Sequence, residues 1–257
     1  MNKLHIPPLD EQAAKTALEH QKILAKPPLA LGKLEPVAIQ IAAMTGNPAP
    51  RLKDKAVVLF AADHHIADHG LSLTSTDVTY IQTRNFLQGG GTINAFTRNA
   101  GARLSVVDVG VNYDFGDLPG LVKRKVMHGA SDFSRGPAMT REQALECLQV
   151  GIDMAREEKA RGLDIVAAGE MGIGNTTPSS AIVAVLTGTP VETVTGRGSG
   201  VKGEVIRKKI ELIEQGIALN KPDPSDAIDV LAKVGGPEIG ALSLIHISEP
   251  TRLLSIS

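Results

Sequence analysis

A glycine-rich stretch near the middle of the chain constrains its fold most strongly. Residues 169–178 read Gly-Glu-Met-Gly-Ile-Gly-Asn-Thr-Thr-Pro, between an apolar run, Ile165–Ala168, and a helix-like run, Ser179–Leu186. This order predicts a strand, a glycine-rich loop and a helix start. Glycines let a backbone approach a ligand closely, and the amides of a first helical turn have no internal partners. The stretch therefore predicts an anion site that suits a phosphate, with a plain strand-to-helix turn as the alternative.

Glu170 is the unusual residue of this stretch. It places a carboxylate at the mouth of a site that otherwise suits anions. A carboxylate in this position favours a substrate that also has a positive charge or an acidic proton. We therefore expect the chemistry of the site to involve a proton or a cation as well as an anion.

Apolar, β-branched runs alternate with helix-like segments along the chain. The expected strands are Ala56–Phe60, Leu104–Val109 and Ile165–Val166. The expected helices between them are Thr76–Leu87, Thr92–Ala100 and Arg141–Arg161, the last opened by a capping box of Thr140 and Gln143. This alternation predicts an α/β fold with a doubly wound, mostly parallel sheet and helices on both faces.

The chemistry-bearing residues follow the predicted strands. Asp63, His64 and His65 come after the first strand, Asp108 ends the second, and Glu170 follows the third. The carboxyl ends of parallel strands meet at one edge of a sheet, where ligands of such folds bind. We therefore expect these side chains to lie at a common site.

The chain is expected to consist of three parts. Residues 1–50 contain two helix-like segments, Glu11–Leu24 and Lys33–Met44, and are expected to form a small N-terminal helical element. Residues 51–241 are expected to form the α/β domain, with later helices at Gly203–Leu219 and Ser225–Val234. Residues 242–257 are expected to be a non-native tail.

Composition excludes several classes of protein. The 257 residues are 42% hydrophobic, 3% aromatic and have a net charge of −1, which gives no indication of nucleic-acid binding. No apolar run has the ~18 residues that a membrane span needs, and no signal peptide is evident. Cys147 is the single cysteine, so an internal disulfide is impossible and a cytoplasmic location is expected.

Beside the glycine-rich loop, further motifs give the chain a resemblance to a known family. The motifs are Ala62-Asp63-His64, Val107-Asp108-Val109-Gly110, Gly136-Pro137-Ala138-Met139-Thr140, Thr195-Gly196 and Val230–Gly236. From residue 5 to about residue 241 the chain resembles the nicotinate-nucleotide–dimethylbenzimidazole phosphoribosyltransferases. The resemblance implies transfer of ribose 5-phosphate from nicotinate mononucleotide to 5,6-dimethylbenzimidazole. The products would be nicotinate and α-ribazole 5′-phosphate, which is used in the lower ligand of cobalamin, and the reaction would need no metal and no cofactor.

The resemblance also implies roles for individual residues. Glu170 would lie beside the reacting centre in a supporting catalytic role, and the benzimidazole pocket would include Thr74, Gln82 and Met171. The nucleotide and its phosphate would be held by two loops and a lysine: Gly172, Gly174, Asn175, Thr176, Thr177, Gly196, Gly198, Ser199, Gly200 and Lys209. From the residues alone, Lys209 is equally well explained as a solvated helix charge, because Arg207 and Lys208 are beside it.

A metal-dependent phosphohydrolase is the alternative function. Asp63, His64, His65 and Asp108 would supply carboxylate and imidazole ligands of the kind that bind divalent metals. The family usually has glycine where this chain has His65, and no role is assigned to His65 or His69. A second alternative is a binding module that keeps the phosphate loops without catalysis.

The end of the chain departs from the family. Residues 242–252 resemble a translated sequencing adapter, so we expect the natural chain to continue differently after Ala241; a genuine terminal strand is the alternative. The principal glutamate base of the family has no match in this sequence. We therefore expect this polypeptide to be inactive or nearly so, while the resemblance implies a homodimer for the full-length protein.

Overall fold

The computed structural model describes residues 7–245, and the predicted tail beyond residue 245 lies outside them. The described residues form two compact units, 7–54 and Lys55–Ile245. Within residues 7–245, no helix combines the length and the apolar character that a membrane crossing requires.

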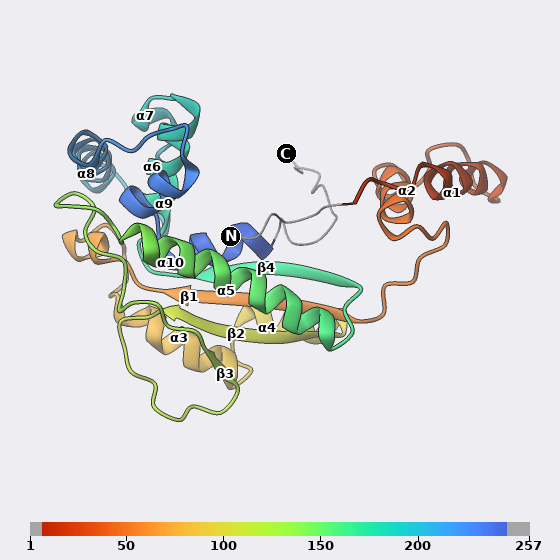
Figure 1. Ribbon diagram of the computed structural model, residues 1–257, viewed down its shortest axis with the longest axis horizontal. Coiled ribbons are helices and arrows are strands. Elements are labelled where there is room, and N and C mark those ends of the chain that lie inside the picture. Colours follow the sequence, from red (N-terminus) through yellow and green to blue (C-terminus); the bar gives the residue numbers. More distant parts are fainter. Residues whose placement is uncertain (1–6, 246–257) are drawn as a thin grey trace. The chain divides into compact units, whose positions relative to one another are not determined.

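The first unit is a pair of helices, α1 (Glu11–Ile23) and α2 (Leu34–Thr45), that pack against each other. The carboxylate of Asp10 caps α1 by accepting a 2.8 Å hydrogen bond from the amide of Ala13. Glu35 is buried in this unit and accepts a 2.7 Å hydrogen bond from Lys26. Both helices lie close to their predicted bounds (Figure 1).

The second unit is built on a parallel sheet of strands in the order β3-β2-β1-β4 (Figure 1). The strands are β1 (Lys55–Ala62), β2 (Ala102–Gly110), β3 (Leu121–Lys123) and β4 (Ile165–Met171). All three neighbouring pairs run parallel. The predicted strands are confirmed, whereas β3 was not predicted because three residues are too few for a periodic pattern.

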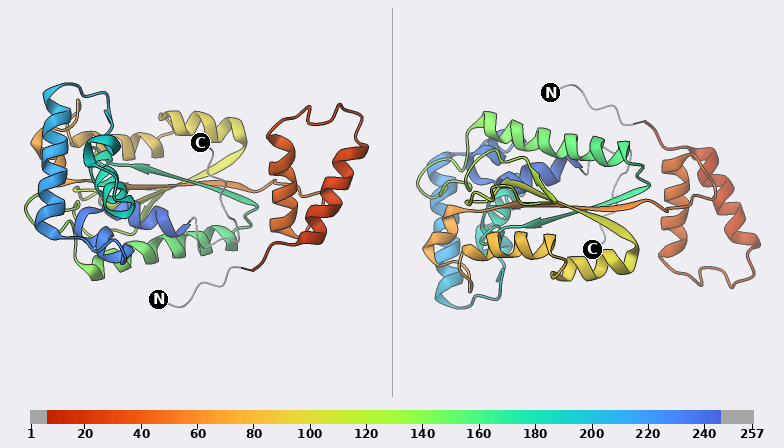
Figure 2. Two further views of the ribbon diagram at one scale, coloured as in Figure 1. Left: turned by 90° about the horizontal axis from the view of Figure 1, so that it is seen from above. Right: turned by 90° about the horizontal axis from the view of Figure 1, so that it is seen from below.

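Helices cover both faces of this sheet, as predicted. Figure 2 shows α5 (Arg141–Ala160) and α10 (Pro237–Ile245) on one face, with α3 (Asp77–Leu87) and α4 (Thr92–Ala100) on the other. The capping box of α5 is present: the Thr140 hydroxyl accepts from the Gln143 amide, and the Gln143 side chain accepts from the Thr140 amide. The doubly wound α/β class is therefore confirmed.

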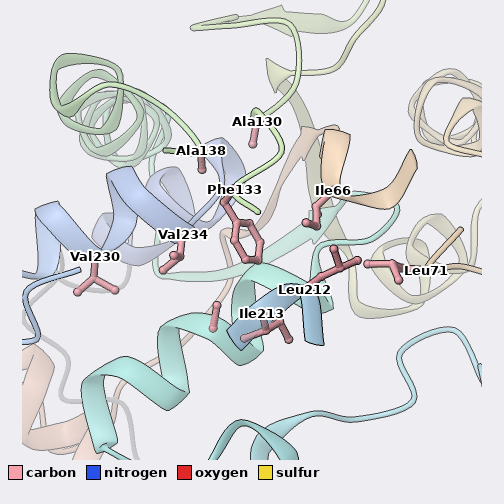
Figure 3. Close-up of a cluster of buried hydrophobic side chains, with 10 residues drawn as sticks. Ile66, Leu71, Ala130, Phe133, Ala138, Leu212, Ile213, Val230 and Val234 are labelled. Carbon is pink, nitrogen blue, oxygen red and sulfur yellow. The ribbon is translucent and has the colours of Figure 1, made fainter. Parts of the chain in front are cut away.

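The remaining helices gather at the carboxyl end of the strands (Figure 1). They are α6 (Thr176–Thr187), α7 (Val191–Val194), α8 (Glu204–Asn220) and α9 (Ala227–Val234). Figure 3 shows Phe133 at the centre of the apolar cluster that joins them. Other members of that cluster are Ile66, Leu71, Ile213, Val230 and Val234. This cluster holds the polar loops above the sheet edge in place.

Four helical segments differ from the prediction. The short 3₁₀ helix η1 (His65–His69) and α7 fall below the length at which periodicity is informative. Helix α6 begins at Thr176 rather than at Ser179, because Pro178 is its third residue and proline is tolerated in a first turn. Helix α10 was not predicted, and it includes residues 242–245, so the alternative of a terminal strand is wrong for these residues. The non-native tail over residues 242–257 stays a prediction.

Candidate functional site

The predicted site residues at the strand ends come together at one edge of the sheet. In the register of the sheet, Phe60 is opposite Glu170, and Ala61 is opposite both Asp108 and Met171. Asp63 and His64 follow directly after β1 and are buried. The ends of these strands therefore meet at one edge of the sheet, as expected from the parallel alignment of β1, β2 and β4. That all these side chains form a common site stays a prediction.

The glycines of the loop after β4 allow the loop to pack against the end of β1. A Cβ atom on Gly172 would lie 2.6 Å from the carbonyl oxygen of Ala62. Gly174 has φ +87°, and a Cβ atom there would lie 2.5 Å from the Cβ of Ala67. Both positions exclude other residues. Close backbone packing within the protein is thus one reason for these glycines.

The backbone amides of this loop are partly used inside the protein. The amide of Ile173 donates a 3.0 Å hydrogen bond to the Thr79 hydroxyl, and the amide of Thr177 donates to the carbonyl of Gly174. The amide of Asn175 donates to the carbonyl of Gly172. Fewer amides are therefore available to an anion than the glycine-rich sequence suggests.

Lys209 lies beneath the first turn of α6. Its side chain is 1% exposed, and its Nζ atom lies 2.7 Å from the hydroxyl oxygen of Thr176 and 3.4 Å from the carbonyl oxygen of Gly196. Burial lowers the pKa of Lys209. Within residues 7–245 the structure gives this ammonium group no carboxylate partner. The interpretation of Lys209 as a solvated surface charge is therefore wrong.

The second predicted loop, residues 196–200, lies beside Thr176 and Lys209. A Cβ atom on Gly198 would lie 2.8 Å from the Thr176 hydroxyl oxygen and 3.7 Å from the Lys209 Nζ atom. The Ser199 hydroxyl lies 3.3 Å from the Ser72 hydroxyl, which in turn contacts Thr74. The structure thus brings Thr176, Gly198 and Lys209 together and connects the loop that contains Thr74 to them.

Glu170 projects from the end of β4 beside the glycine-rich loop, and its side chain is exposed. One carboxylate oxygen accepts a hydrogen bond from the Nδ2 atom of Asn175. The protein around the carboxyl group partly removes it from water and so raises the pKa of Glu170. Repulsion from Glu238 raises this pKa further, while Asn175 and His64 offset part of the rise.

His64 forms a buried pair with a residue that sequence reasoning missed. Its Nε2 atom lies 2.8 Å from the Oε1 atom of Glu238, and both side chains are almost fully buried. Burial alone would lower the pKa of His64, but Glu238, Asp63 and Glu170 together raise it. The local signal for Glu238 is its place after Gly235 and Gly236 at a helix start, yet its partner is 174 residues away.

The predicted benzimidazole residues lie on three separate elements. Met171, at the end of β4, and Tyr80 pack against the same apolar cluster. The ring centroids of Tyr80 and Tyr113 lie 3.9 Å apart. Gln82, on α3, accepts a hydrogen bond from Asn85. In the part of the chain that the structure describes, no hydrogen bond joins Thr74 or Gln82 to Met171.

The metal-dependent phosphohydrolase alternative has no support. Asp108 is engaged by Lys125 at 2.8 Å, and His64 by Glu238. His65 contacts Asp68 at 3.1 Å. Among residues 7–245, no group of three or more His, Cys, Asp or Glu side chains is placed to hold a metal ion.

His65 and His69 have identifiable contacts instead. The Nε2 atom of His65 lies 3.2 Å from the carbonyl oxygen of His128, and that of His69 lies 2.8 Å from a carboxylate oxygen of Asp132. A small cavity of about 80 Å³ opens beside His65 and is lined also by Asp63, Tyr80 and Asn112.

Comparison with known proteins gives matches along nearly the whole chain. A family model described as phosphoribosyltransferase matches residues 6–247. A nicotinate-nucleotide–dimethylbenzimidazole phosphoribosyltransferase of Geobacter sulfurreducens is 50% identical over 236 residues, which are 92% of this chain and 67% of the relative. A protein of the same name from Roseiflexus sp. is 48% identical over 251 residues, which are 98% of this chain and 71% of the relative.

The fold matches as well. The crystal structure of CobT from Thermus thermophilus superimposes with a TM-score of 0.87 at 42% sequence identity. The match covers 92% of this chain and 71% of that one. The chain thus spans about two thirds to seven tenths of the length of these relatives.

Proposed function

Because the chain belongs to the phosphoribosyltransferase family whose members are named nicotinate-nucleotide–dimethylbenzimidazole phosphoribosyltransferases, we propose that it acts in cobalamin nucleotide-loop assembly. The proposed reaction transfers ribose 5-phosphate from nicotinate mononucleotide to 5,6-dimethylbenzimidazole. The new bond forms between a ring nitrogen of the benzimidazole and C1′ of the ribose. The bond between C1′ and the pyridine nitrogen breaks, nicotinate leaves with the electron pair, and the benzimidazole N–H proton passes to a base.

The meeting of Thr176, Gly198 and Lys209 is the observation that supports this proposal most directly. A buried ammonium group without a carboxylate partner is costly, and an anionic ligand would offset that cost. The Thr176 hydroxyl and the glycine-rich turn beside Lys209 can donate to phosphate oxygens. We assign the phosphate of the mononucleotide to this point.

The other nucleotide-binding residues are assigned by their position around the proposed phosphate site. Thr177 is fully buried in the same helical turn, and its hydroxyl oxygen has no hydrogen-bond partner within residues 7–245. The set proposed to hold the nucleotide is Gly172, Gly174, Asn175, Thr176, Thr177, Gly196, Gly198, Ser199, Gly200 and Lys209.

Glu170 is proposed to act beside the reacting centre. Its carboxylate lies at the mouth of the same loop, and its raised pKa makes it a better proton acceptor than an ordinary glutamate. The neighbouring Met171 is proposed to contact the flat face of the benzimidazole, together with Thr74 and Gln82. The reaction has no step that requires a metal or a redox cofactor.

The proposal also covers the oligomeric state and the location of the protein. A second copy of the chain is the proposed partner, because the family resemblance implies a homodimer. The cytoplasm is the proposed location, since the single cysteine, Cys147, is buried as a free thiol.

A binding and turnover experiment tests the function. Nicotinate mononucleotide should bind on the order of 10- to 100-fold more tightly than the riboside that lacks the phosphate. This polypeptide should bind the mononucleotide with little or no turnover, because no residue matches the principal glutamate base that the resemblance implies. A relative that contains this glutamate should yield α-ribazole 5′-phosphate in a reaction that EDTA leaves unchanged. Equal affinity for the mononucleotide and the riboside would contradict the assigned phosphate site, and turnover by this polypeptide comparable to that of the relative would contradict its expected inactivity.

A further inference from the structure

The buried pair of His64 and Glu238 lies directly beneath the glycine-rich loop. His64 follows β1, and Glu238 is in the first turn of α10, which packs on β1 and β4. The side chains are 1% and 0% exposed, and their hydrogen bond is 2.8 Å long. The pair therefore connects the end of the central strand to a helix on one face of the sheet.

Two glycines pack closely against the imidazole ring of His64. A Cβ atom on Gly236 would lie 2.3 Å from the Cε1 atom of His64 and 2.9 Å from the Oε2 atom of Glu238. A Cβ atom on Gly172 would lie 3.3 Å from the Nε2 atom of His64. Because backbone from both segments packs closely against the ring, the loop after β4 and the start of α10 restrict its position.

The pair is surrounded by negative charge. Glu238, Asp63 and Glu170 all act on His64, and their combined attraction outweighs the effect of burial and raises its pKa. The Oε2 atom of Glu238 is buried without a hydrogen-bond partner among the described residues. An ion pair that is buried in this way is rarely a net gain in stability over an apolar pair of the same size. A role in the site explains its presence better.

The path from the pair to Glu170 is short. Gly172 lies between the pair and Asn175. A Cβ atom built on Gly172 would lie 3.3 Å from the Nε2 atom of His64 and 3.4 Å from the Nδ2 atom of Asn175. Asn175 donates its hydrogen bond to Glu170. Glu238 raises the pKa of Glu170 and His64 lowers it, so the two members of the pair act on Glu170 in opposite directions.

We propose that His64 and Glu238 form a positioning pair that sets the charge state and the orientation of Glu170 from beneath the glycine-rich loop. Neither side chain touches the substrate in this arrangement, since both are buried. The purpose of the pair, to hold Glu170 ready to accept a proton, rests on the proposed function. The electrostatic coupling itself does not.

The first test uses reciprocity between His64 and Glu170. If the charge of Glu170 stabilises the imidazolium form of His64, removing that charge must lower the titration midpoint of His64. We expect Glu170→Gln to lower the ¹⁵N-detected titration midpoint of His64, because a negative charge that favours the imidazolium form is lost. Glu204→Gln, an exposed glutamate at the start of α8, is the control and should leave the midpoint unchanged.

The second test measures the midpoint of the Glu170 carboxyl group by ¹³C NMR. The variant that replaces both His64 and Glu238 by glutamine removes the two charges together, since each buried charge depends on the other. It should lower the midpoint of Glu170, because Glu238 raises the pKa of Glu170 more than His64 lowers it. A purely structural pair would leave the midpoint unchanged, so an unchanged or raised midpoint would overturn the proposal.

Changes to a buried pair can be destabilising, so the Glu170→Gln measurement is the decisive one if the double variant fails to fold. Glu170 is exposed, and its substitution leaves the core intact. An unchanged His64 midpoint in that variant would overturn the proposal by itself. No substrate is present in these titrations, so a failure of the proposed function, seen as absent mononucleotide binding, is distinguishable from a failure of the coupling.

Discussion

The Nζ atom of Lys209 lies 2.7 Å from the hydroxyl oxygen of Thr176, which joins the middle of α8 to the first turn of α6. The residues are 33 positions apart: Thr176 follows the first glycine-rich loop, and Lys209 is on the helix after the second. Their contact means that the two loops predicted to hold a nucleotide share one buried cation. A ligand anion at this point would therefore bind to both segments at once.

Replacing Lys209 by methionine should weaken binding of nicotinate mononucleotide on the order of 10- to 100-fold, because hydrogen bonds to a charged group are lost. The fold should be retained, since methionine fills the buried space without an unpaired charge. Lys208→Met is the matched control, because Lys208 is exposed on the same helix and donates to the carbonyl of His69. Isothermal titration calorimetry on both variants measures the effect, and equal losses of affinity would refute the assignment.

Gly174→Ala should lower the free energy of unfolding by about 2–4 kcal/mol. The new methyl group meets the Cβ of Ala67 at 2.5 Å and must adopt φ +87°, so steric overlap adds to backbone strain. Gly136→Ala is the control, because its Cβ would have nothing within 4 Å, and its effect should stay within about 0.5 kcal/mol. Urea denaturation followed by circular dichroism compares the two, and similar stabilities would show that the loop relaxes around the methyl group.

Arg103→Met should destabilise the second unit by about 1–3 kcal/mol, because the fully buried Glu158 loses a 2.7 Å hydrogen bond. Arg161→Met should have a smaller effect, since Arg161 is 55% exposed and lies 3.1 Å from the same carboxylate. Burial alone would raise the pKa of Glu158, but Ser105 and the arginines hold it below its ordinary value.

The sign of the pH dependence follows from that lowered pKa. Stability from Glu158 is present above the unfolded pKa of about 4.3 and is lost as the pH falls through the lower folded pKa. The destabilisation by Arg103→Met should therefore shrink in acid. A difference between wild type and variant that stays constant down to low pH would contradict this.

His64 should make the protein less stable in alkaline solution. Its folded pKa is raised, so the stability that it contributes is fully present below about pH 6.5 and is lost as the pH rises through the folded pKa. The difference in unfolding free energy between wild type and His64→Gln should thus decline as the pH rises above about 6.5. Denaturation curves at pH 6 and pH 9 measure it; a difference that grows with pH would mean that His64 is neutral in the folded state.

Much of this fold follows from local patterns, because the apolar runs and caps around β1, β2 and α5 all agree with one another. The convergence of Asp63, Asp108 and Glu170 could also be predicted, since parallel strands bring their carboxyl ends together. Local sequence patterns cannot predict whether a charged side chain is buried. In the sequence, Lys209 does not differ from the exposed lysine and arginine beside it. In the fold, its side chain is buried beneath a loop from another part of the chain.

Long-range contacts explain the other differences. In the sequence, Glu238 is an ordinary glutamate at a helix start. Its contact with His64 forms only in the folded chain, and no spacing rule links residues 174 positions apart. The glycines at 172 and 174 were interpreted as making room for a ligand. The structure adds that they make room for Ala62 and Ala67, which is a packing requirement that the sequence of the loop does not contain.

The two tyrosines of the chain, Tyr80 and Tyr113, lie with their ring centroids 3.9 Å apart, and the protein has no tryptophan. Tyr80 packs against the same apolar cluster as Met171. Nearly all of the intrinsic ultraviolet emission of the protein therefore originates at a single place, and a ligand that contacts this tyrosine pair will alter it. The protein thus contains its own unlabelled fluorescent reporter for this side of the site, free of background from the rest of the chain.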